Sequence, residues 1–77
     1  MRVEVYNNLI YDEKLFIVVD IGTFLDNFVT KDIRMNLYAV DKFYVELIYN
    51  SEINKISEIR SFKKEIHLDK YTIHIKL

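Results

Sequence analysis

Three consecutive runs with the composition of β-strands lie between Arg34 and Phe62, and they constrain the fold more than any other part of the chain. Turn-like breaks separate the runs at Asp41-Lys42 and at Asn50-Ser51-Glu52. β-branched and aromatic runs divided by short polar breaks are typical of hairpins. The stretch therefore predicts an antiparallel meander, against which the rest of the chain packs.

A two-residue loop at Asp41-Lys42 fixes the register of the first hairpin. One face then carries four pairs: Val40 with Phe43, Tyr38 with Val45, Asn36 with Leu47, and Arg34 with Tyr49. The other face pairs Ala39 with Tyr44, Leu37 with Glu46, and Met35 with Ile48. Since both faces are partly apolar, something must cover the second one. Asp-Lys is not a preferred type I′ pair, so a longer loop that shifts the register by one and swaps the faces is the alternative.

The third run is open to two interpretations. Ile53, Ile56, Ile59 and Phe62 recur every three residues, and Ser51 could cap a helix. The polar cluster before the run suits a hairpin loop, and isoleucine, serine and phenylalanine suit a strand. We predict a strand over Lys55 to Phe62.

The first third of the chain predicts a helix and an added strand. The segment Arg2 to Tyr6 alternates like a strand but could equally be a loose arm. Tyr11 to Gly22 contains a β-branched run, yet Asp12 as N-cap and Gly22 as a stop favour a helix. That helix would cover the second face of the sheet with Leu15, Phe16 and Val19 on one side. We expect a further strand from Thr23 to Val29, turning through Thr30-Lys31-Asp32, although its apolar residues also fit helical spacing.

The tail from Glu65 to Leu77 predicts another hairpin about Asp69-Lys70. Its second arm places four apolar side chains on one face: Tyr71, Ile73, Ile75 and Leu77. The expected fold is therefore α+β, a small antiparallel β-meander of four to five strands with one covering helix. Residues 1–77 form a single domain in this interpretation, because no linker or repeat interrupts them.

Composition narrows the possible functions. The 77 residues are 51% hydrophobic and 30% charged, which excludes intrinsic disorder, and no apolar run is long enough to span a membrane. The chain has no cysteine and one glycine, so thiolate metal sites and phosphate-binding glycine loops are excluded. We expect a cytoplasmic protein without signal peptide or cofactor. A net charge of −1 makes nucleic acid an unfavoured partner.

Several short motifs lie in one part of the chain: Gly22-Thr23-Phe24-Leu25, Asn36-Leu37-Tyr38, Phe43-Tyr44-Val45-Glu46, Tyr49, Asn54 and Ile59-Arg60-Ser61-Phe62. Together they cover about half of the chain and resemble a recurring pattern in small uncharacterised single-domain proteins of bacterial genomes. The resemblance implies a helix followed by an antiparallel meander, and it implies no activity or catalytic residue. The tail departs from the pattern, which implies a short helix where this chain alternates as a strand.

No catalytic residues are predicted, and the candidate functional residues are those of a partner-binding surface. They are Tyr44, Glu46, Arg60, Lys63, Lys64 and Ile75. An exposed Tyr44 beside Met35 and Ile48 would have the composition of a binding patch, whereas burial under the helix is the favoured alternative. We expect a non-enzymatic interaction protein of the inhibitor, immunity or antitoxin kind.

Three other functional hypotheses remain from the sequence. A small nuclease or RNA-binding module would use Arg60, Lys63, Lys64, His67 and Tyr71, although acidic residues lie among them. A metal held by His67, His74 and Glu65 is a weaker hypothesis than two exposed histidines, so no metal site is predicted. A homodimer would cover the apolar face of the tail around Ile75.

Overall fold

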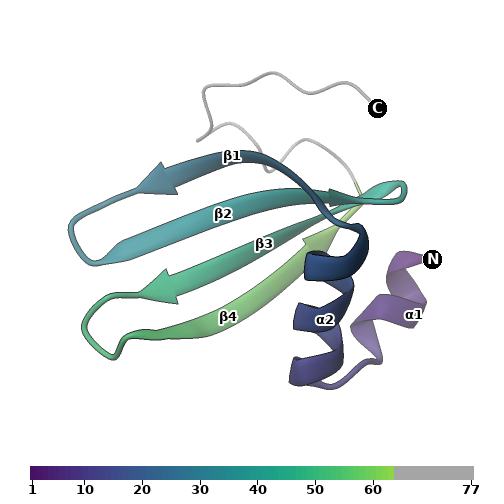
Figure 1. Cartoon of the computed structure of the whole chain (residues 1–77), viewed down its shortest axis with the longest axis horizontal. Helices are drawn as coiled ribbons and strands as arrows, with labels where there is room; N and C mark the ends of the chain where they lie inside the picture. The colour runs from purple at the N-terminus through teal and green to yellow at the C-terminus, as the bar shows by residue number, and fades with distance from the viewer. Residues whose placement is uncertain (64–77) are drawn as a thin grey trace.

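The computed structural model describes residues 1–63 and shows an antiparallel sheet accompanied by two short helices (Figure 1). The elements are α1 (Val3–Asn7), α2 (Tyr11–Ile21), β1 (Thr23–Val29), β2 (Ile33–Val40), β3 (Phe43–Asn50) and β4 (Lys55–Phe62). The four strands lie side by side in chain order, each antiparallel to the next. The α+β meander is confirmed. The predicted tail hairpin, and with it a fifth strand, lies outside the described residues.

The register between β2 and β3 is the predicted one at every pair. Val40 pairs with Phe43 across a two-residue loop, and Leu37 pairs with Glu46 farther along. The loop stays this short because Asp41 adopts a left-handed conformation with φ 52°. A short polar side chain tolerates that conformation better than most residues, so the loop needs no glycine.

A bulge explains the three-residue spacing of isoleucines in β4. Ile56 pairs with Tyr49 and Ile59 with Leu47, while Ser57 between them is the extra residue. The Ser57 hydroxyl donates a hydrogen bond of 3.2 Å to the Ile48 carbonyl oxygen. A bulge shifts the alternation by one residue. Ile56 and Ile59 therefore pack on the same core, and the predicted strand over Lys55–Phe62 is confirmed.

Both helices pack on the same side of the sheet and contribute to the core there. We call this side the helix face and define it by Phe43, Val45 and Leu47. Val3 and Tyr6 of α1 and Val18 of α2 join these residues in one buried cluster. The expectation that the helix after Tyr11 covers the other side, the opposite face of Leu37, Tyr44 and Glu46, is wrong, because α2 packs on the helix face. From Phe43 to Leu47, the side chains that β3 directs toward the helix face are all apolar, whereas Glu46 points to the opposite face. The apolar side chains of α2 therefore pack better on the helix face, where they bury no carboxylate.

The orientation of α2 differs from the prediction. Val18 is 2% exposed and packs on the sheet with Leu15 and Ile17, whereas Phe16 is 65% and Val19 84% exposed. Of the three side chains expected to face the sheet, only Leu15 does. At about 100° per residue, Phe16 points nearly opposite to Val18, whereas Val19 lies about 100° from Val18, next to the half-buried Leu15 at the edge of the packed side. The helix also begins after Ile10 as N-cap, not at Asp12.

The N-terminal segment is a helix, not the predicted strand or loose arm. Val3 and Tyr6 are both buried, and a spacing of three residues puts them on one side of a helix, while Val5 is exposed. The Tyr6 ring packs against Phe43 with ring centroids 5.4 Å apart. Tertiary packing of Tyr6 thus overrides the local alternation. Neither helix in the described part of the chain is long and apolar enough to span a membrane.

Candidate functional site

Two of the predicted partner-binding residues lie inside the protein. Tyr44 and Glu46 are each 1% exposed, on the opposite face of the sheet. Tyr44 clusters with Leu37 and stacks near Phe62 at 5.7 Å between ring centroids. Neither side chain presents surface to a partner in this conformation, and neither lies under α1 or α2.

The predicted basic residues within the described range are both engaged by carboxylates. Arg60 pairs with Glu58 on its own strand, and its Nη1 nitrogen lies 3.9 Å from Glu46 Oε1 on β3. Hydrogen bonding between Arg60 and Glu58 lowers the pKa of the carboxyl and raises the pKa of the guanidinium.

Lys63 lies against α1. Its Nζ is 2.6 Å from Glu4 Oε2, and this contact lowers the pKa of the Glu4 carboxyl. Lys63 and Arg60 therefore pair with different carboxylates, and the two cations do not form one binding site. The remaining predicted site residues, Lys64, His67, Tyr71, His74 and Ile75, lie outside the described residues.

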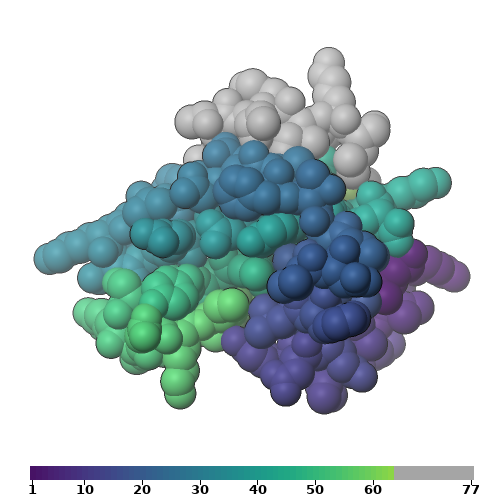
Figure 2. All heavy atoms as spheres, viewed as in Figure 1, coloured from purple at the N-terminus to yellow at the C-terminus, as the bar shows by residue number. Residues whose placement is uncertain are grey.

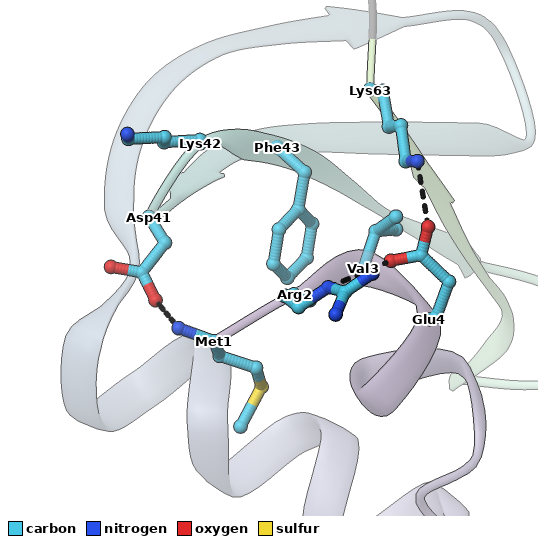
Figure 3. Close-up of a pocket in the computed structure, with 8 residues that line it drawn as sticks. All are labelled: Met1, Arg2, Val3, Glu4, Asp41, Lys42, Phe43 and Lys63. Atoms are coloured by element: carbon cyan, nitrogen blue, oxygen red, sulfur yellow. Dashed lines mark hydrogen bonds and ion pairs between the residues drawn. The ribbon is translucent and has the colours of Figure 1, made fainter.

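A cavity of about 400 Å³ opens where α1 meets the β2–β3 loop (Figure 3). Its lining residues are Met1, Arg2, Val3, Glu4, Asp41, Lys42, Phe43 and Lys63. The Phe43 ring faces the cavity between two charged pairs, the Met1 amine with Asp41 and Lys63 with Glu4. The volume suits a small molecule, and among residues 1–63 its lining side chains are apolar, basic or acidic, with no hydroxyl or imidazole.

Metal chemistry finds no support in the part of the chain that the structure describes. Residues 1–63 contain no group of three histidine, cysteine or acidic side chains placed to hold a metal ion. Both histidines of the metal hypothesis, His67 and His74, lie outside the described residues.

The most exposed apolar side chains of α2 form a surface that sequence reasoning missed. We define the outer face of α2 as Asp12, Phe16, Val19 and Asp20, all exposed to solvent. Figure 2 shows α2 at the near surface of the molecule, with no other segment over it in this view. Phe16 lies midway along this face, Val19 and Asp20 lie toward the end of the helix, and Asp12 lies toward its start.

A signal for this surface was present in the sequence. Leu15 to Val19 is an uninterrupted run of five apolar residues. A helix that packs on one side can bury only about half of such a run, because successive side chains point in all directions around the axis. At least two had to face outward in any helical interpretation, whichever rotation the helix adopted.

Of the three acidic residues of α2, Glu13 forms a local hydrogen bond, whereas the side chains of Asp12 and Asp20 form none within residues 1–63. Glu13 Oε1 accepts a hydrogen bond of 3.1 Å from the Ile10 backbone amide and so caps the helix. Within residues 1–63, neither Asp12 nor Asp20 forms an ion pair. The outer face of α2 therefore combines two exposed apolar side chains with two available negative charges.

Comparison of the chain with protein-family models, with curated proteins and with solved structures found no match.

Proposed function

We propose that this protein is a non-enzymatic interaction domain, of the inhibitor, immunity or antitoxin kind, that binds another protein through the outer face of α2. The observation that carries the proposal is the exposure of Phe16 and Val19, at 65% and 84%. Both lie on one side of a regular helix, whose backbone can present them without rearrangement. Apolar anchors on a rigid helix are a common way to bind a groove in a partner.

Fold stability does not account for these two side chains. They make little contact with the core, which α2 reaches through Leu15, Ile17 and Val18. Burying a phenylalanine or valine completely contributes about 1.5–3 kcal/mol, and most of this contribution is absent while the side chain faces water. A binding partner would recover it, which supports a role in association.

The nuclease or RNA-binding alternative receives less support from the described residues. Phosphate binding requires cations that are free to replace counterions. Arg60 and Lys63 each lie against a carboxylate, and the outer face of α2 is acidic. A cytoplasmic location and a homodimer formed through the tail stay predictions.

Site-specific photo-crosslinking tests the proposal. A photoreactive phenylalanine analogue at position 16 should give a discrete adduct with another protein in lysate of the native host. Ile53 is the matched control, since it is 55% exposed in the β3–β4 loop at the far end of the sheet from α2 (Figure 1). The same analogue at position 53 should give no such adduct.

Two substitutions complete the test. Phe16→Ser and Val19→Ser should each reduce recovery of the same partner in affinity purification, while Ile53→Ser should not. All three side chains are exposed, so the variants should fold. The absence of an adduct from position 16, or equal recovery of the crosslinked partner with Phe16→Ser and with wild type, would refute the proposal.

A further inference from the structure

The acidic side chains on the outer face of α2 have a regular spacing that specifies a partner. Asp12 and Asp20 each lie four residues from Phe16, one toward the start and one toward the end of the helix. Side chains four residues apart lie on the same side of a helix, one turn above the other. The two carboxylates are therefore separated by about 12 Å along the axis, with the Phe16 ring between them.

We infer that the partner presents an apolar socket for Phe16 flanked by two lysine or arginine side chains about 12 Å apart, a spacing set by the rise of the helix. This inference rests on the proposed function and adds the chemistry of the surface that α2 recognises. Charge complementarity at the rim of an apolar contact fixes orientation and accelerates association. Val19 extends the contact on the same side of the helix.

The position of Asp20 provides an independent reason to expect a cationic partner. It lies in the last turn of α2, where the helix dipole disfavours negative charge and where no basic residue offsets it. Asp12 in the first turn is favourable for the helix, but Asp20 is not. A residue that weakens its own helix and pairs with nothing in the described chain has no structural role that explains it.

Other occupants of this surface fit less well. A second copy of the chain docked through the same face would place Asp12 and Asp20 among like charges, which disfavours the contact. An anionic membrane or a nucleic acid would meet the same repulsion from the two carboxylates. A protein with a basic rim around an apolar socket satisfies both features together.

The inference is tested with the partner that crosslinks to position 16, identified by mass spectrometry and purified. Its dissociation constant is measured against wild type and against Asp12→Asn, Asp20→Asn and the double variant, at low and at moderate salt. The double variant should bind about 5-fold or more weakly at low salt, and its affinity should depend less on salt concentration. Asp32→Asn in the β1–β2 turn is the matched control and should bind like wild type.

A second readout separates binding from folding. Asp20→Asn removes a charge that the helix dipole disfavours, so its melting temperature should equal or exceed that of wild type while its affinity falls. A residue with a merely structural role would not change these two quantities in opposite directions.

The outcomes distinguish this inference from the proposed function. If Phe16→Ser weakens binding but the double asparagine variant binds like wild type at both salt concentrations, the interaction surface stands and the basic rim is refuted. An adduct with the mass of two copies of this chain would replace the basic partner with a homodimer. If position 16 yields no adduct at all, the proposed function fails and the inference fails with it.

Discussion

The Tyr6 hydroxyl donates a hydrogen bond of 3.1 Å to the Lys14 carbonyl oxygen and thereby joins α1 to α2. Tyr6 is completely buried, and its ring also packs on Phe43 of β3. One side chain consequently connects both helices to the sheet. Because α1 is a helix of only five residues, its position depends on contacts of this kind and not on intrinsic helix stability.

Tyr6→Phe should lower the free energy of unfolding by about 1–2 kcal/mol, since it removes a buried hydrogen bond and leaves the Lys14 carbonyl without that donor. In a domain of this size the melting temperature should fall by about 4–8 °C for each kcal/mol. Tyr11→Phe is the control, because the Tyr11 hydroxyl makes a longer and more exposed hydrogen bond of 3.4 Å to the Ile56 carbonyl. Equal losses in the two variants would contradict the role assigned to Tyr6.

The same tyrosine predicts a loss of stability at alkaline pH. Burial raises the pKa of Tyr6 from 10.0 to about 12. The unfolded chain therefore loses this proton first as the pH rises, so the stabilising contribution is complete below pH 10 and disappears between pH 10 and about 12. Chemical denaturation across this range should show a steeper fall for wild type than for Tyr6→Phe. Parallel curves for the two proteins would mean that Tyr6 ionises normally in the folded state.

The β2–β3 register could be predicted because a two-residue loop determines which residues face each other, and Asp41 can adopt the conformation that such a loop needs. Because side chains alternate between the two faces of a strand, Tyr44 and Glu46 were also correctly predicted to lie on the same face. Burial of Tyr44 was the favoured alternative, but burial of Glu46 could not be predicted, since exposure depends on what covers a face and not on alternation within the strand.

The rotation of α2 was beyond sequence reasoning for a related physical reason. With apolar residues from Leu15 through Val19, several rotations bury a similar amount of apolar surface, so periodicity does not choose among them. The rotation of α2 about its axis is set by the packing of Val18 into the cluster around Phe43. The candidate site consists of the side chains that this choice leaves outside, which is why none of its residues was predicted as a site.

Gly22 connects α2 to β1 and should not tolerate a larger residue. Its backbone is extended, with φ −74° and ψ 142°, so a left-handed conformation is not the reason for glycine here. A Cβ atom at this position would lie 2.4 Å from the Val18 carbonyl oxygen, which accepts a hydrogen bond of 2.9 Å from the Gly22 amide. Gly22→Ala should therefore destabilise the domain by about 1–3 kcal/mol. A variant that unfolds at the wild-type denaturant concentration would show that the junction relaxes without cost.

Val18 and Val19 offer a matched comparison within one helix, since they are the same residue type in adjacent positions with exposures of 2% and 84%. Val18→Ala removes two methyl groups from the core beneath α2 and should cost about 1.5–3 kcal/mol, through lost burial and the cavity left behind. Val19→Ala should change stability by less than about 0.5 kcal/mol, and in the stabilising direction, because alanine favours a helix more than valine does.

The two substitutions should have the opposite order of effects on binding affinity. Val19→Ala should weaken association with the partner that crosslinks to position 16, while Val18→Ala, measured below its melting transition, should bind like wild type. Denaturant titrations and affinity measurements on the two variants check both halves of the prediction. If Val19→Ala destabilises the fold as much as Val18→Ala, then α2 packs on the sheet through a different side, and the outer face defined by Phe16 and Val19 would have to be abandoned.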